Sequence, residues 1–367
     1  MPHPTRDGGR KATMMALVYR GPNQLALEER PRPTVEQPTD AIVRITTTTI
    51  CGTDLHIRHG DVPTILPGRI LGHEGVGVVD AVGESVSSIR TGERVLISLI
   101  TSCGRCSFCR KAMYSHCRTG GWLLGNRIDG TQAEYVRVPL ADTGLYALPD
   151  AVGDEAAVLL SCILPTGLEC GAMNAQVKPG DVVAIIGAGP VGLATLLTAQ
   201  LYSPAAIVMI DLDDHRLQVA RSLGATQTVN SADGTAVAQV MALTHGTGVD
   251  VAIEAVGIPA TFDLCQEIIA PGGRIANVGV HGTPVTLHLE RLWAANITLT
   301  TRLVDAATTP MLLGMIQSGR LDAGRLVSHR FPLAAILEAY ETFGDAARQR
   351  AIKVLITTAG ARDTTRR

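Results

Sequence analysis

The sequence predicts an α/β protein made of two differently built parts, because the hydrophobic pattern changes along its 367 residues. From Met14 to about Asp150, short β-like runs are separated by Gly, Pro and Asp, which is typical of a folded-over, barrel-like β domain. From Asp181 onward, unbroken apolar runs alternate with helix-like segments, which is typical of a doubly wound parallel sheet. The predicted class is therefore a β-barrel domain followed by a doubly wound α/β domain.

The first part begins after a polar segment. Residues 1–12 are rich in Arg, Gly and Pro, so we expect a mobile tail there. The expected strands of the barrel-like domain are residues 41–49, 75–82, 94–100 and 134–138.

The second part opens with a βαβ unit, in which strand 182–187 leads into helix 187–202 and strand 206–211. The alternation continues with helix 213–225, strand 226–230, a helix around 237–243, strand 249–257, a helix around 260–269 and strand 274–280. After Thr301 we expect one or two helices, and then two strands, 327–331 and 351–356, that return to the first domain.

Composition and charge exclude several classes of partner. The 32 Lys and Arg residues nearly balance the 34 Asp and Glu residues, and no block of like charge would attract nucleic acid or a membrane surface. No apolar run reaches the ~18–20 residues of a transmembrane helix. The first residues lack the apolar segment of a signal peptide, so we expect a cytoplasmic protein.

Eight cysteines are present, and four of them cluster within 15 residues. In a chain without an export signal, such clustering indicates metal ligands rather than disulfides. Four thiolates form the closed, tetrahedral kind of zinc site that stabilises loops, and an iron–sulfur cluster is the alternative. The four residues are Cys103, Cys106, Cys109 and Cys117, and the segment 101–119 around them is expected to be an exposed lobe.

A dinucleotide site is predicted at the start of the second part. Gly187, Gly189 and Gly192 form a G-x-G-x-x-G motif between a strand and a helix, and Asp211 ends the next strand 19 residues after Gly192. The helix N-terminus would face the phosphates, and Asp211 would bind the ribose hydroxyls and repel a 2′-phosphate. NAD is therefore favoured over NADP, although Arg216 could partly accommodate a phosphate. A glycine-rich turn without ligand is the alternative.

A second metal site would be assembled from distant segments. Residues 68–79, GRILGHEGVGVV, place His73 and Glu74 side by side in an apolar stretch, where a buried ionisable pair needs a neutralising partner. Two thiolates, Cys51 and Cys162, and the His73 imidazole would leave one zinc coordination position open, as catalysis requires. Singly, Cys162 is more often a small buried hydrophobe and His56 a surface histidine, so the prediction depends on the set.

Taken together, the motifs resemble those of the zinc-dependent medium-chain alcohol dehydrogenases. The matching segments are CGTDLH, GHEGVGVV, the four-cysteine lobe, the TG after Cys162, GAGPVG with Asp211, and the strand ends EAVG and NVGV. They extend over residues 14–356. The resemblance implies a GroES-like catalytic domain at 13–160 with a structural-zinc lobe at 101–119, a Rossmann NAD-binding domain at 161–303, and a return to the catalytic domain at 304–367.

The resemblance also implies residue roles. Cys51, His73 and Cys162 would hold catalytic zinc, and the four lobe cysteines a second, structural zinc. Glu74 would be a carboxylate able to approach the metal, Asp54 would orient His73, and Thr53 and His56 would form a proton relay. The remaining implied contacts are to the cofactor and involve Pro190, Val191, Val256 and Val278.

The implied activity is NAD-dependent interconversion of small primary or secondary alcohols with aldehydes or ketones. A polyol, threonine or formaldehyde-type dehydrogenase on the same scaffold is the alternative, and a zinc-stabilised interaction module without catalysis is the alternative from another class. The chain lacks a long insertion between Cys117 and Cys162, so it resembles the microbial type, in which a homotetramer is favoured over a dimer.

Overall fold

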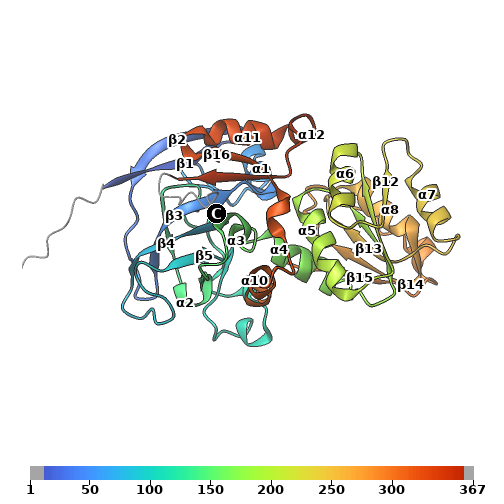
Figure 1. Cartoon of the computed structure of the whole chain (residues 1–367), viewed down its shortest axis with the longest axis horizontal. Helices are drawn as coiled ribbons and strands as arrows, with labels where there is room; N and C mark the ends of the chain where they lie inside the picture. Colours follow the sequence, from blue (N-terminus) through green and yellow to red (C-terminus); the bar gives the residue numbers. More distant parts are fainter. Residues whose placement is uncertain (1–11, 359–367) are drawn as a thin grey trace, which may run out of the picture.

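The computed structural model describes residues 12–358 and shows two domains, each built around its own sheet (Figure 1). The expected tail at 1–12 lies outside the described residues, apart from residue 12. No described helix combines the length and apolar character needed to cross a bilayer.

The second domain is a six-stranded, fully parallel sheet with the order β12-β11-β10-β13-β14-β15. Its strands are β10 (Val182–Ile186), β11 (Ala206–Asp211), β12 (Gln227–Asn230), β13 (Val249–Glu254), β14 (Ile269–Asn277) and β15 (Thr298–Thr301). The intervening helices are α5 (Pro190–Ala199), α6 (Asp214–Ser222), α7 (Ala236–Leu243) and α8 (Pro259–Ile268). The strand order reverses between β10 and β13, which is where ligands bind in such sheets. The predicted doubly wound fold is confirmed.

The first domain contains a seven-stranded sheet with the order β16-β17-β3-β4-β5-β9, in which β8 also pairs with β3. These strands are β3 (Ala41–Thr49), β4 (Gly75–Val82), β5 (Arg94–Ile97), β8 (Tyr135–Val138), β9 (Leu145–Ala147), β16 (Val327–Pro332) and β17 (Lys353–Thr357). A hairpin of β1 (Thr13–Gly21) and β2 (Gln24–Pro31) lies beside it, and β6 (Ile100–Thr101) pairs with β7 (Gly121–Trp122).

The C-terminal strands belong to this first sheet, because β17 pairs antiparallel with β3. Leu355 lies opposite Thr49, so two segments from opposite ends of the sequence share one ladder. The exact domain boundaries at 160 and 303 remain predictions.

Several expected elements differ from the structure. The two C-terminal strands do not follow one another directly, because helices at 336–344 and 346–349 lie between them. The single strand expected at 94–100 is divided into β5 and β6, and Ser98 hydrogen-bonds to Gly144 instead of continuing the strand. The helix expected to reach residue 269 ends at Ile268, and β14 begins at once and carries Pro271 and the two following glycines within it. The pairing of β14 with β13 shifts register there, so these residues form an irregular start to the strand.

Short helices connect the two sheets. α3 (Asp154–Val158), α4 (Ile163–Thr166) and η3 (Gly167–Met173) lead from the first domain into the second, and α10 (Thr309–Gln317) lies beside α4 on the way back (Figure 1). One continuous apolar core includes Val76 and Leu96 of the first sheet and Val183 of the second, so the two domains pack against each other.

The remaining helices of the described residues are α1 (Gly52–His59), η1 (Cys109–Lys111), η2 (Tyr114–His116), α2 (Ala141–Gly144), η4 (Gln200–Tyr202), α9 (Leu289–Leu292), η5 (Ala323–Leu326), η6 (Leu333–Ala335), α11 (Ile336–Gly344) and α12 (Ala346–Gln349).

Candidate active site

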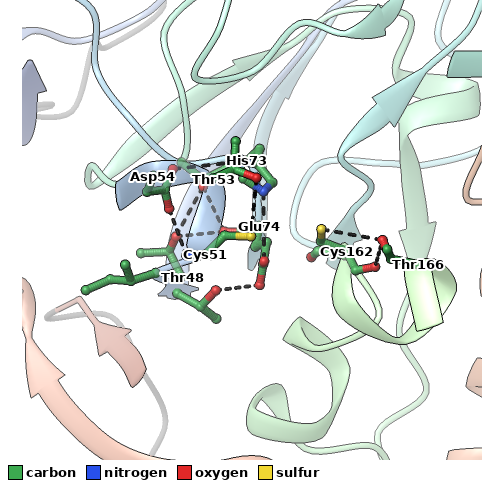
Figure 2. A network of polar contacts seen from close by, with 12 residues as sticks. Thr48, Cys51, Thr53, Asp54, His73, Glu74, Cys162 and Thr166 are labelled. Atoms are coloured by element: carbon green, nitrogen blue, oxygen red, sulfur yellow. Dashed lines mark hydrogen bonds and ion pairs between the residues drawn. The ribbon is translucent and has the colours of Figure 1, made fainter. Parts of the chain in front are cut away.

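Four potential metal ligands from three distant segments meet beside the junction of the domains. Cys51 precedes α1, His73 and Glu74 immediately precede β4, and Cys162 precedes α4. All four side chains are buried, and their ligand atoms lie within 4.8 Å of one another. Figure 2 shows Cys51, His73 and Glu74 together, with Cys162 on the segment that also carries Thr166.

The set has the donor chemistry of a zinc site. Two sulfur atoms, one imidazole and a nearby carboxylate are ligands that Zn²⁺ prefers. His73 Nδ1 lies 3.8 Å from Asp54 Oδ1, and both atoms are buried without a hydrogen-bond partner in the described chain. A metal-ligating histidine usually points its other nitrogen at such a carboxylate, so the residues fit a zinc ion on Nε2.

Asp54 is itself fixed by its neighbours. Its Oδ2 accepts hydrogen bonds from the Cys51 N–H (2.9 Å) and from Gln132 Nε2 (3.1 Å), and Gln132 Oε1 accepts one from the Tyr340 hydroxyl (2.8 Å). Burial raises the pKa of Asp54 to about 6, although the nearby His73 opposes this effect. The sequence alone gave no signal for Gln132 or Tyr340.

The charges of the donors depend on one another. The hydrogen bond between the two thiols lowers the pKa of Cys51 well below its ordinary value and raises the pKa of Cys162 well above it. Burial alone would lower the pKa of His73, but its contacts with the Cys51 sulfur raise that pKa to about 9. The cluster therefore concentrates negative charge that only a cation or protons can balance.

The four lobe cysteines form a second cluster, with ligand atoms also within 4.8 Å of one another. Cys106 Sγ lies 3.5 Å from Cys109 Sγ, and the Cys103 N–H donates to Cys117 Sγ (3.2 Å). The Cys109 N–H lowers the pKa of Cys106 to about 6, whereas desolvation raises the pKa of Cys109 to about 12. Four sulfur donors fill all four positions of a tetrahedral zinc ion, so this cluster matches a closed structural site.

The glycine-rich turn has the geometry that the motif predicts. Gly187 has φ 103°, and a Cβ on Gly192 would lie 1.8 Å from Gly187 O, so neither position tolerates a side chain. Nothing lies within 4 Å of a Cβ built on Gly189, the N-cap of α5, so the backbone is open to a ligand there.

Asp211 has a structural contact that the motif did not predict. Its Oδ2 accepts the Ala188 N–H of the turn (2.6 Å) and its Oδ1 accepts the Asp213 N–H (2.9 Å). Arg216, on α6, has a buried Nε without a hydrogen-bond partner among the described residues. Asp211 therefore fixes the turn as well as ending β11.

A cleft of about 1070 Å³ joins the Cys51–His73–Cys162 cluster to the glycine-rich turn at Gly189. It brings together these sequence-predicted residues: Cys51, Thr53, His56, His73, Cys162, Gly189, Pro190, Val191, Val256 and Val278. Residues 111–113, 115 and 116 of the cysteine lobe also line it, although the four cysteines do not. Asp54, Glu74, Asp211 and Arg216 lie outside the lining, in supporting positions.

Several cleft residues were missed from sequence. Leu99, Trp122 and Val304 pack in one cluster with Cys51 and Cys162, and scattered apolar residues give no motif. Lys353 also lines the cleft although its side chain is 0% exposed. A single lysine inside the apolar run AIKVLI was the available signal, because a lysine on the buried face of a strand needs a partner.

Two family models match this chain. The model "Alcohol dehydrogenase GroES-like domain" matches residues 37–150, and the model "Zinc-binding dehydrogenase" matches residues 190–318. The chain belongs to the zinc-dependent medium-chain alcohol dehydrogenase family. It is an oxidoreductase of the zinc-type alcohol dehydrogenases, as the sequence predicted.

Similar proteins support this assignment over nearly the whole chain. An alcohol dehydrogenase of Cupriavidus necator is 38% identical over 91% of this chain and 96% of its own length. The apo form of zinc dependent alcohol dehydrogenase 2 from Streptococcus pneumonia has a TM-score of 0.91 and 53% identity, covering 95% of this chain and 99% of that chain. Alcohol dehydrogenase TADH from Thermus sp. ATN1 has a TM-score of 0.87 and 38% identity. This match covers 94% of this chain and 100% of that chain.

More distant relatives vary in substrate and cofactor. A sorbitol dehydrogenase of Bacillus subtilis is 29% identical over 89% of this chain and 93% of its own length. An E. coli structure complexed with NADH has a TM-score of 0.86 and 29% identity, covering 94% of this chain and 99% of its own. A Sinorhizobium meliloti structure bound to NADP has a TM-score of 0.84 and 26% identity. This match covers 95% of this chain and 100% of that chain. Family membership alone therefore fixes neither substrate nor cofactor.

Proposed function

We propose that this dehydrogenase interconverts small primary or secondary alcohols with aldehydes or ketones, using NAD and a catalytic zinc ion. The observation that carries the proposal is the cleft itself, which places Cys51, His73 and Cys162 across from the glycine-rich turn at Gly189. A metal site and a dinucleotide site sharing one cleft fit hydride transfer between a metal-oriented alcohol and a nicotinamide ring.

Cys51, His73 and Cys162 would hold the zinc, and Asp54 would keep the His73 ring oriented. Zinc acts as a Lewis acid that lowers the pKa of an alcohol and polarises a carbonyl. The two thiolates balance the charge of a divalent ion, so the buried site would carry no net charge from these groups.

Thr53 and His56 would move the alcohol proton to solvent. Thr53 Oγ1 lies 3.8 Å from Cys51 Sγ, next to the metal donors, and can accept a proton there. The His56 side chain is 40% exposed, and its Nδ1 lies 3.1 Å from Asp61 Oδ2. No hydrogen bond joins Thr53 to His56 within residues 12–358, so a third group, such as the cofactor ribose, would complete the relay.

The substrate end of the cleft favours alcohols with one hydroxyl group and an apolar chain. Leu99, Trp122 and Val304 pack around the metal donors, and the Trp122 Nε1–H is already bonded to Leu124 O (3.0 Å). The several hydroxyls of a polyol would lack partners against this surface, which costs binding free energy. The polyol and threonine alternatives are therefore less favoured, and the rate panel described below separates the formaldehyde-type alternative.

NAD would be preferred over NADP. Asp211 keeps its carboxylate at the end of β11, where it would repel a 2′-phosphate and accept ribose hydroxyls. Arg216 opposes this preference, because its Nε has no hydrogen-bond partner among residues 12–358 and its guanidinium could attract a phosphate.

The lobe would hold a second zinc through Cys103, Cys106, Cys109 and Cys117. Its role would be structural, since four sulfur donors leave no position for substrate. The alternative of a non-catalytic interaction module is disfavoured, because the chain belongs to an enzyme family.

The protein would act as a homo-oligomer, with a tetramer favoured over a dimer. β15 is the last strand of the parallel sheet, so one side of its backbone has no strand partner within residues 12–358. Close to it in sequence, Trp293 is 79% exposed and Leu289 on α9 is 59% exposed. Large exposed apolar side chains and an unpaired strand edge in the described chain are both features of surfaces that bind a second copy of a chain.

One experiment tests the proposal most directly. Zinc content per chain is measured together with NADH absorbance on a panel of aliphatic alcohols, polyols and aldehydes. We expect zinc in both sites and the highest kcat/KM on monohydric alcohols. Turnover by a protein shown to lack metal at Cys51 would disprove the mechanism, and a polyol as best substrate would overturn the proposed substrate class.

A further inference from the structure

Lys353 is a fully buried lysine whose ammonium group is bound to the carboxylate next to the metal donors. Its Nζ lies 2.9 Å from Glu74 Oε1 and 2.8 Å from Oε2, and it donates to Ile50 O at 3.1 Å. Both side chains are almost completely buried, with exposed fractions of 0% and 1%. The two opposite charges are therefore almost completely removed from bulk water, and removing one would leave the other buried without its ion-pair partner.

The backbone of Glu74 is fixed, so only its side chain can move. Glu74 O accepts hydrogen bonds from the Thr48 and Thr131 hydroxyls, each at 2.7 Å. The Thr49 hydroxyl donates to Glu74 Oε2, on the same carboxylate that Lys353 holds. The position of this carboxylate is thus set by side-chain torsions and by two polar partners.

This position decides whether the metal site is open or closed. A carboxylate oxygen of Glu74 lies within 4.8 Å of the ligand atoms of Cys51, His73 and Cys162. Three protein ligands leave a zinc ion with a vacant position, whereas four close it. Glu74 can therefore pair with Lys353 or complete the coordination of the metal, and the two partners compete for it.

We propose that Lys353 is a positioning residue that holds Glu74 out of the coordination sphere of the catalytic metal and so keeps one position open for substrate. The inference rests on the proposed zinc site. Charge balance supports it, since two thiolates already neutralise a divalent ion and Lys353 neutralises Glu74. Without the ammonium, Glu74 would be a buried, unpaired carboxylate, and the bound metal would be the cation available to it.

The test uses the full-length protein with cobalt(II) in the catalytic site and imidazole as a probe of the vacant position. Visible absorbance reports imidazole binding without any turnover. For Lys353→Met we expect imidazole to bind at least about 10-fold more weakly and the metal to be lost more slowly to a chelator. Lys178→Met, a surface substitution, is the matched control and should leave both values unchanged.

Two further variants separate positioning from general damage to the fold. Glu74→Gln/Lys353→Met removes both charges and should restore imidazole affinity to within about 3-fold of the unmodified protein. Glu74→Gln alone should bind imidazole as the unmodified protein does, because Glu74 is already held away from the metal. This second comparison does not depend on Lys353→Met folding.

The outcomes distinguish the inference from the function on which it rests. If the unmodified protein binds no cobalt at Cys51, His73 and Cys162, the proposed metal site is wrong. If it binds cobalt but Glu74→Gln binds imidazole at least about 10-fold more tightly, Glu74 already ligates the metal and Lys353 does not hold it away. Unchanged imidazole binding in Lys353→Met would also overturn the inference.

Discussion

Asp305 and Ser115 join the cysteine lobe to the segment that follows β15. Asp305 Oδ1 accepts hydrogen bonds from both the Ser115 N–H (2.9 Å) and the Ser115 hydroxyl (2.8 Å), and its Oδ2 pairs with Arg302. The main chain of this segment is held by Glu169, a buried carboxylate that accepts the N–H groups of Asp305, Ala306 and Thr308. The lobe is therefore a wall of the cleft that is held to the segment following β15, and through that segment to Glu169.

Removing this fastening should loosen the cleft. For Ser115→Ala we expect KM for the alcohol to rise about 2- to 5-fold, since one hydrogen bond worth about 1 kcal/mol is lost. Asp305→Ala should have a larger effect, because both bonds to Ser115 disappear. Steady-state kinetics with fixed NAD check this, and Ser107→Ala, at an exposed lobe position, is the control. An unchanged KM in Asp305→Ala would show that the lobe does not shape the substrate end.

Removing a catalytic-site ligand should separate turnover from cofactor binding. We expect His73→Ala to lose one zinc per chain and to lower kcat by about 10³-fold or more, because Lewis-acid activation is lost. NADH binding, followed by fluorescence, should persist, since the glycine-rich turn is untouched. Cys265→Ala, in the core of the second domain and outside both metal clusters, is the control. Normal turnover by a His73→Ala protein with one zinc fewer would contradict the assignment.

Changing the end of β11 should weaken cofactor discrimination. For Asp211→Gly we expect the NAD/NADP ratio of kcat/KM to fall by about 10-fold or more, because the charge that repels a 2′-phosphate is removed. The Ala188 N–H also loses its acceptor, so affinity for both cofactors should decrease. Arg216→Ala should move the ratio in the opposite direction. The ratio is measured with one alcohol at saturating concentration, and a constant ratio in Asp211→Gly would remove this role.

The edge of the parallel sheet should control the oligomeric state. We expect Leu299→Arg, on β15, to shift the protein toward smaller species in sedimentation experiments, because a charge would be buried between copies. Leu337→Arg, on α11 in the first domain and similarly exposed, should leave the oligomer intact. If the two variants sediment alike, β15 is not the interface.

Asp142 should increase the free energy of unfolding at neutral pH and lose this effect at acidic pH. Burial would raise the pKa of Asp142, but hydrogen bonds from Ser88 and Ser87 outweigh it and lower that pKa to about 2. Because the folded pKa lies below the unfolded value of about 3.9, the stabilisation is complete above the unfolded pKa and is lost as pH falls toward 2. Asp142→Asn should thus cost about 1 kcal/mol at pH 7 once solvent screening is allowed for.

The measurement for Asp142 is urea unfolding of both proteins between pH 7 and pH 4. The stability difference should be constant down to about pH 5 and should begin to shrink near pH 4. A difference that stays the same down to the lowest pH at which both proteins fold would point to a lost contact rather than a lost charge. In a Ser87→Ala/Ser88→Ala background, Asp142→Asn should have a smaller effect.

The features that could be predicted from the sequence by itself are short motifs and periodic patterns. The lobe cysteines fall within 15 residues and the glycine-rich turn within six, so their spacing already defines their chemistry. The alternation of apolar runs with helical segments fixed the doubly wound sheet, because each buried parallel strand must be apolar along its whole length. Donor chemistry proposed Cys51, His73 and Cys162 as one ligand set, and the family resemblance implied the same set.

Only the tertiary structure decided the contacts between segments far apart in the chain. Lys353 is 279 residues from Glu74 and Asp305 is 190 residues from Ser115, and no periodicity encodes such pairs. Burial made them recognisable, because a charge removed from water must find a partner and the partner is set by how the sheets and helices pack. Sequence indicates which groups can do chemistry, and packing determines which of them hold the others in place.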